Sequence, residues 1–215
     1  MKNSILSMCF LLACLLTLYS CSAPQGLEIG YNGIWIGELP EVHFGIKSDK
    51  TEFNVDDVTL DFSYGNGSNT DVGGYVGGDG EDCPIVCIAL YFYNAKYLDT
   101  AARFGEARFD DYKEIQDFYF VKEISLADYN ESYDVDNSVL GRRYEHTDAL
   151  TIPKEALELS SGYVCLGVLQ IAYVPSINKY RIVGGSEAAL KYEMLDEHTV
   201  RLSEPGTTSY TDPQE

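Results

Sequence analysis

The side chains that most often carry enzyme catalysis are scarce in this sequence. Its three histidines are His43, in an apolar alternating stretch, and His146 and His198, in polar turn-like segments. A nucleophile, a base and an orienting acid must meet in space to form a catalytic triad, and no G-x-S-x-G turn presents a serine. The 34 acidic residues would supply a glycosidase pair in any fold, so they favour no reaction. We therefore predict that the protein is not an enzyme.

Two acidic segments resemble calcium-binding loops in part. Residues 77–83, GGDGEDC, resemble the first half of a calcium-binding nonapeptide repeat, which implies Asp79 and Asp82 as candidate ligands. Such repeats share each ion between stacked turns. Only one copy is present here, and Pro84 stands where a large apolar residue belongs.

The second segment, residues 134–145, reads DVDNSVLGRRYE and places acids at the first, third and twelfth positions of an EF-hand loop. Asp134 and Asp136 are its candidate ligands, but Val139 replaces the central glycine. The expectation is therefore no cofactor, with a structural calcium ion as the open alternative.

The first residues resemble a targeting signal. Lys2 precedes an apolar stretch of about 14 residues, which is shorter than the roughly 20 that cross a bilayer and fits a secretory signal. Leu18-Tyr19-Ser20-Cys21 resembles the lipobox of bacterial lipoproteins, those of the Bacteroides type in particular. The resemblance implies cleavage after Ser20 and lipidation of Cys21. A competing box ends at Cys14, but it leaves a very short apolar core before it.

This resemblance predicts the organisation of the chain and its location. A signal peptide would span 1–20, a lipidated tether 21–30, a β-sandwich domain 31–203 and a flexible tail 204–215. Acyl chains on Cys21 would anchor the protein in the cell envelope. We expect the outer membrane, with the periplasmic face favoured because no acid follows Cys21 before Glu28.

The charge balance limits the partners. With 34 acidic against 15 basic residues the chain has a formal charge of −19. Nucleic acid and anionic lipid surfaces would repel such a chain. We therefore predict no nucleic-acid partner and no membrane contact beyond the lipid anchor.

The pattern of apolar residues predicts an all-β fold. The composition is rich in tyrosine and phenylalanine, which favour strands, and apolar runs are short and separated by turn residues. A short helix is expected near 110–116 and a helical turn after Pro153. Strands are predicted at 33–37, 42–47, 57–63, 84–93, 118–125, 149–153, 163–174, 179–183, 188–195 and 199–203, with 84–93 and 163–174 apolar on both faces and therefore central.

One segment resembles immunoglobulin-like domains. In ALTIPKEALELSSGYVCLGV, residues 149–168, a strand and a helical turn precede Tyr163, two residues before Cys165. This is similar to the tyrosine corner of that fold. The resemblance implies an Ig-like or Greek-key sandwich in which Cys165 faces Cys87 across the two sheets as a candidate disulfide, although no tryptophan follows Cys87. Cys83 would then be unpaired.

Ligand binding is the role that these observations favour. Aromatic ring faces can stack on the apolar faces of sugars, and Trp35, Tyr64 and Tyr75 are candidates for such a platform, with Tyr93, Tyr129 and Tyr133 as further members. We expect an envelope lipoprotein that is a non-enzymatic binding or assembly module for a glycan or a protein. The alternatives are a fimbria-like or adhesin accessory subunit that accepts a donor strand, and a polysaccharide hydrolase.

Overall fold

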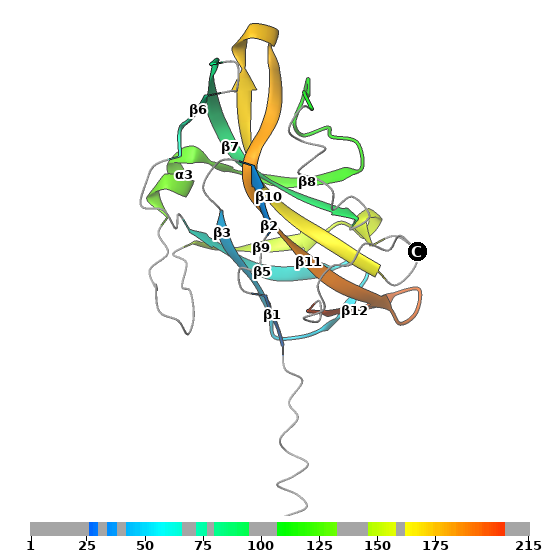
Figure 1. Ribbon diagram of the computed structural model, residues 1–215. Helices are drawn as coiled ribbons and strands as arrows, with labels where there is room; N and C mark the ends of the chain where they lie inside the picture. Colours follow the sequence, from blue (N-terminus) through cyan, green and yellow to red (C-terminus); the bar gives the residue numbers. More distant parts are fainter. Residues whose placement is uncertain are drawn as a thin grey trace, which may run out of the picture.

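Two antiparallel sheets packed as a sandwich form the described part of the chain (Figure 1). The structure is a computed structural model, and it describes residues 26–29, 34–37, 42–65, 72–76, 80–94, 107–132, 146–157 and 162–204. The all-β sandwich is the predicted fold class. The strands are β1 (Leu27–Ile29), β2 (Ile34–Gly37), β3 (His43–Ser48), β4 (Glu52–Asn54), β5 (Val58–Gly65), β6 (Gly74–Val76), β7 (Asp82–Asn94), β8 (Phe118–Ser125), β9 (His146–Ile152), β10 (Gly162–Val174), β11 (Lys179–Met194) and β12 (Thr199–Ser203).

The smaller sheet has the order β1-β3-β5-β9. In β5, Val58, Leu60 and Phe62 are buried, while the residues between them are exposed or only partly buried. This alternation is the one expected for a strand with one face on the core and the other toward solvent. The strand predicted at 57–63 is confirmed. β1 begins at Leu27, so this edge strand occupies part of the segment expected to be tether.

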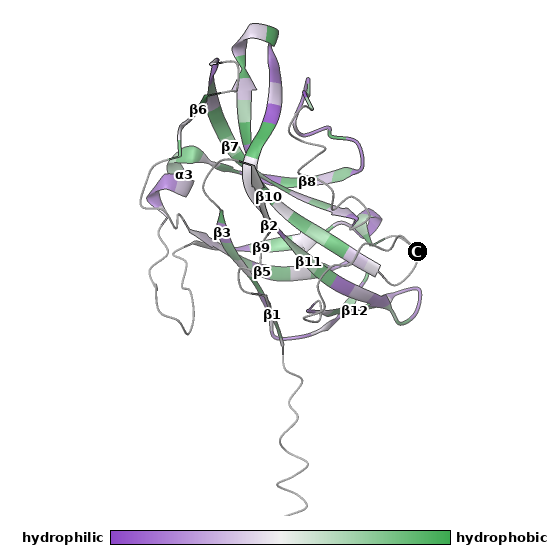
Figure 2. Ribbon diagram, viewed as in Figure 1, coloured by the Kyte–Doolittle hydropathy of each residue, from purple (hydrophilic) through white to green (hydrophobic). Residues whose placement is uncertain are grey.

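The larger sheet has the order β4-β12-β11-β10-β7-β6, and β2 and β8 pair with β11 and β7. β10 lies between β7 and β11 and is buried along most of its length. The two segments predicted to be central are therefore β7 and β10, as expected. β11 joins two predicted strands into one, with a register shift opposite Gln170 and Ile171. Bands of hydrophobic and hydrophilic residues alternate along the end of the β10–β11 hairpin, which projects beyond the sandwich (Figure 2).

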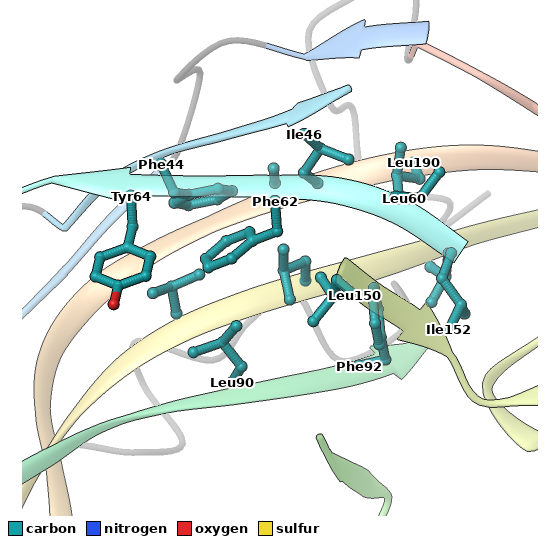
Figure 3. Close-up of a cluster of buried hydrophobic side chains, with 14 of the residues drawn as sticks. Phe44, Ile46, Leu60, Phe62, Tyr64, Leu90, Phe92, Leu150, Ile152 and Leu190 are labelled. Atoms are coloured by element: carbon teal, nitrogen blue, oxygen red, sulfur yellow. The ribbon is translucent and has the colours of Figure 1, made fainter. Parts of the chain in front are cut away.

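Aromatic and aliphatic side chains from both sheets fill the space between them (Figure 3). Phe62 lies at the centre of the smaller sheet's contribution, with its ring centroid 6.0 Å from Phe44 and 5.8 Å from Tyr64. Leu90 and Phe92 of β7 enter from the larger sheet and are fully buried. Burying each such side chain stabilises the fold by about 1.5–3 kcal/mol.

The outer face of the larger sheet is also covered. Residues 107–117, which we call the strap, cross this face before β8. Phe109, Tyr112 and Ile115 of the strap pack against buried residues of the sheet. These are Cys87, Ala89, Tyr91, Tyr93, Cys165, Leu169, Ile171 and Ile182. The backbone of Phe109 pairs with that of Tyr180 on β11 through two hydrogen bonds of 2.9 and 2.8 Å. The strap contains turns but no helix, so the helix predicted near 110–116 is wrong.

Short helical segments lie beside the sandwich. The helical turn expected after Pro153 is η2 (Lys154–Ala156). A helix that was not predicted, α3 (Leu126–Glu131), follows β8. The Ser125 hydroxyl accepts a hydrogen bond from the Asp128 N–H and so caps the helix.

The disulfide implied by the immunoglobulin resemblance is absent. Cys87 and Cys165 lie on neighbouring strands of the same sheet, where Cys87 pairs with Ile171 and Cys165 with Tyr93. Six residues of strand separate the two positions, about 20 Å, whereas a disulfide needs Cα atoms within about 7 Å. Cys83, Cys87 and Cys165 are all buried, and none of the three forms a disulfide. Tyr163, the expected corner tyrosine, lies in β10 with 37% of its surface exposed.

Candidate functional site

Several aromatic residues predicted to form a ligand platform belong to the core instead. Tyr64, Tyr93 and Tyr129 are 7%, 0% and 1% exposed, so no ligand can stack on their rings. Tyr64 on β5 and Tyr129 on α3 pack into the core between the sheets, and Tyr93 on β7 is buried on the outer face of the larger sheet. That part of the prediction is wrong.

The side chains of the other predicted platform residues are not described by the structure. Only the backbones of Trp35, in β2, and Tyr75, in β6, are described, where they pair with Ser186 and Cys83. Tyr133 lies outside the described residues.

A different set of rings gathers where the strap meets the end of the β10–β11 hairpin. Tyr112, Phe120, Tyr173 and Tyr180 are all partly exposed, and we call them the aromatic ledge. The centroid of Tyr112 lies 5.0 Å from Tyr180 and 6.5 Å from Phe120, in edge-to-face contacts. Tyr173 lies 5.6 Å from Tyr180 with the ring planes tilted by 56°. Three elements, the strap, β8 and the hairpin, thus contribute to one aromatic surface.

Polar side chains lie beside these rings. Tyr112 donates a hydrogen bond of 2.7 Å to the Glu123 carboxylate, which also accepts from Lys113 Nζ at 2.9 Å. These two hydrogen bonds, with that from Lys113 the stronger cause, lower the pKa of Glu123 below its usual range. Desolvation, and then the bonds to Glu123 and Cys87, raise the pKa of Tyr112. The ledge therefore presents a neutral phenol beside a carboxylate.

Buried side chains support the ledge from below. The hydroxyl of Tyr91, itself fully buried, donates a 2.7 Å hydrogen bond to the Tyr112 carbonyl oxygen. Burial raises the pKa of the nearby Cys87 thiol to about 11, so it stays protonated at neutral pH. A buried neutral thiol is a poor nucleophile, and Cys87 contributes packing to the site.

The end of the hairpin is held by side-chain hydrogen bonds. Both oxygens of Glu81, just before β7, accept bonds from Ser176, at 2.7 Å from its N–H and 2.6 Å from its hydroxyl. Tyr173 donates to the Asn178 side chain at 2.7 Å, and Asn178 takes the left-handed backbone conformation (φ 53°) that closes the turn after η3 (Pro175–Ile177). Ile177 is 50% exposed at the tip.

A second polar contact, between Tyr93 and Glu187, is buried on the outer face of the larger sheet. The ring of Tyr93 crosses Gly167 on the neighbouring strand, and its hydroxyl donates to the buried carboxylate of Glu187 on β11. A Cβ at Gly167 would lie only 2.9 Å from Tyr93 Cε1. Because both side chains are at most 2% exposed, this pair orders the sheet and does not face solvent.

The predicted metal ligands are not brought together in the described residues. Asp82 is exposed at the start of β7, and Asp79, Asp134 and Asp136 lie outside the described ranges. No group of three or more His, Cys, Asp or Glu side chains within those ranges could share a metal ion.

The histidines lie apart from the ledge in sequence and in strand pairing. His43 begins β3, and His146, of which only the backbone is described, begins β9. His198 is exposed in the β11–β12 turn, where its Nε2 lies 3.3 Å from a carboxylate oxygen of Glu197. Cys21 and the predicted signal lie outside the described residues, in which no helix has the length and apolar character needed to span a bilayer.

Comparison with known protein families, with curated proteins and with solved structures finds no match to this chain. The choice of the aromatic ledge as the candidate functional site therefore depends only on the residues that form it. Partly exposed rings next to hydrogen-bonding groups are the features that ligand sites combine.

Proposed function

We propose that the protein is an envelope-anchored, non-enzymatic lipoprotein that binds a glycan on the aromatic ledge. The observation that carries this proposal is the group of four partly exposed rings bordered by Lys113, Glu123 and Asn178. A sugar ring offers apolar C–H faces and a rim of hydroxyl groups. The ledge offers the complementary surfaces, ring faces for stacking and polar groups for the hydroxyls.

A glycan fits this surface better than an apolar peptide. The rings are tilted against one another by 56° to 73° and no flat apolar area results. Three of the four rings are tyrosines, so the hydroxyl groups of Tyr112, Tyr173 and Tyr180 add polar atoms to this surface. Aromatic side chains with a polar end suit ligands that are part apolar and part wet.

The position of the ledge supports a role at the end of a lipid tether. β1 lies at one end of the sandwich and the β10–β11 hairpin projects from the opposite end (Figure 1). The six residue-to-residue steps from Cys21 to Leu27 would reach about 20 Å in an extended chain. A lipid on Cys21 would thus hold the β1 end near the membrane and direct the ledge away from it.

The glycan role is tested by binding of the detergent-purified full chain to a glycan array. We expect selective binding that Tyr173→Ala weakens about tenfold, since one stacked ring contributes about 1.4 kcal/mol. Tyr163→Ala is the matched control, because Tyr163 is a 37% exposed tyrosine at the other end of the same strand. No glycan binding, or equal loss in the two variants, would contradict the proposal.

The anchor is tested separately. Cys21→Ser should move the protein from the membrane fraction to the soluble fraction, and Cys14→Ser should not. If Cys21→Ser remains in the detergent phase while Cys14→Ser leaves it, the lipidated residue is Cys14.

A further inference from the structure

We infer that the aromatic ledge selects electrically neutral glycans over acidic ones and leaves no open place for a ligand cation over Tyr112 and Phe120. This inference rests on the glycan role proposed above and concerns the charges around the same rings. Two arrangements carry it, one for each sign of ligand charge.

The ledge has no place for a ligand cation over two of its rings, because a lysine of the chain already occupies it. Lys113 Nζ lies 5.5 Å from the Tyr112 ring centroid and 5.4 Å from that of Phe120. Cations within about 6 Å of a ring centroid are attracted by the negative ring face. The same ammonium group pairs with Glu123 at 2.9 Å, and a cationic ligand would have to displace it to reach this side of the two rings.

Anionic sugars meet the opposite obstacle. The strap carries four acidic side chains, Asp110, Asp111, Glu114 and Asp117, against two basic ones, Arg108 and Lys113. The lysines nearest the rings are already paired, Lys113 with Glu123 and Lys179 with Asp110 at 2.6 Å. A carboxylate or sulfate group on the ledge would therefore approach an acidic surface on a chain whose formal charge is −19.

Neutral polyols escape both obstacles. Their hydroxyl groups can accept from Lys113 and donate to Glu123 without breaking the ion pair, and their ring faces can contact Tyr173 and Tyr180. The paired charges thus serve as fixed hydrogen-bonding groups and as a filter against charged ligands.

The test is affinity electrophoresis of the detergent-purified full chain through gels that contain one polysaccharide each. The neutral probes are β-glucan, mannan and xylan, and the acidic probes are polygalacturonate and alginate. We expect at least one neutral polysaccharide to bind tenfold or more tightly than either acidic one, and Tyr173→Ala to abolish that difference. An acidic polysaccharide that binds as tightly as any neutral one, in a manner that depends on Tyr173, would overturn the inference and leave the glycan role standing.

A charge variant makes the test specific. Glu114→Lys alters an exposed strap side chain and should strengthen binding of polygalacturonate about threefold at low salt, while its affinity for the neutral polysaccharide stays the same. Unchanged binding of polygalacturonate would show that the acidic strap is not the filter. If no polysaccharide is retarded, or if Tyr173→Ala binds like the unaltered chain, the proposed function itself is wrong.

Discussion

Tyr173 and Tyr180 lie directly opposite each other on β10 and β11, with ring centroids 5.6 Å apart. Directly opposed residues of an antiparallel pair project on the same face of the sheet. The hairpin continues beyond the sandwich and this pair is partly exposed, whereas Tyr91 and Tyr93 on β7 of the same sheet are fully buried. The strap then adds Tyr112 beside Tyr180 and completes the aromatic ledge.

Binding to the ledge should be insensitive to pH between about 5 and 8. The bonds from Lys113 and Tyr112 lower the pKa of Glu123 below its usual range, so the carboxylate stays ionised throughout this interval. Affinity should fall only in stronger acid, when Glu123 gains a proton and its pair with Lys113 is lost. Titration calorimetry at pH 4 to 8 measures this, and a steep change in affinity near pH 6 would contradict it.

Gly167→Ala should destabilise the fold by about 1–3 kcal/mol, because a buried methyl group would force the ring of Tyr93 away from Glu187. The added Cβ would lie 2.9 Å from the ring and 3.3 Å from the Tyr93 hydroxyl oxygen. Urea unfolding followed by circular dichroism gives the free energy of unfolding. The control is Gly74→Ala on β6, where nothing lies within 4 Å of a new Cβ. Equal stability of the two variants would show that Tyr93 does not need the space over Gly167.

The cysteine thiols should react slowly in the folded protein. Burial raises the pKa of Cys87 to about 11, and it also raises the pKa of Cys165 well above its usual value. The folded chain thus holds these protons while the unfolded chain loses them near pH 9. The contribution of Cys87 to stability is present in full below pH 9 and is lost as the pH rises toward 11.

The measurement is alkylation at pH 8 followed by mass spectrometry, with and without urea. Cys83, Cys87 and Cys165 should be protected in the folded state and all labelled in urea without a reducing agent. A pair that is labelled only after reduction would reveal a disulfide and contradict the arrangement of β7 and β10.

Glu81→Ala should loosen the hairpin end and leave the sandwich intact. The change removes both hydrogen bonds to Ser176, each contributing about 0.5–1.5 kcal/mol. Amide hydrogen exchange at residues 176–178 should accelerate several-fold, with protection of β5 unchanged. Asp82→Ala is the matched control one residue on. Equal exchange at the tip in both variants would show that Glu81 does not hold it.

Much of the sandwich follows from its sequence because one property, alternation, decides it. Val58, Leu60 and Phe62 recur at every second residue, and a strand is the only conformation that buries all three together. The continuous apolar run from Ile85 to Tyr93 is also informative, since it is typical of a central strand covered on both faces. The segment that covers the outer face of the sheet could not be predicted in the same way. The strap is held on the sheet by backbone hydrogen bonds between Phe109 and Tyr180, which lie 71 residues apart in the sequence, and no local pattern reveals such a contact.

The errors have physical causes as well. Phe109, Tyr112 and Ile115 recur at every third residue, which is close to the helical period and favours a helix. In the structure the strap is an irregular segment, and it packs all three side chains against the sheet. The helix α3 was missed although Ser125 and Asp128 form a capping signal. Since tyrosine serves equally in a core and in a binding surface, composition could not separate Tyr64 and Tyr93 from Tyr173 and Tyr180.

The most direct test of the glycan role is an NMR titration of the full chain, labelled at tyrosine, with an oligosaccharide of the neutral polysaccharide that it binds. Ring resonances of Tyr112, Tyr173 and Tyr180 should shift together in one saturable process while those of Tyr163 stay unchanged. Saturable shifts confined to other tyrosines, with these three unaffected, would contradict the account.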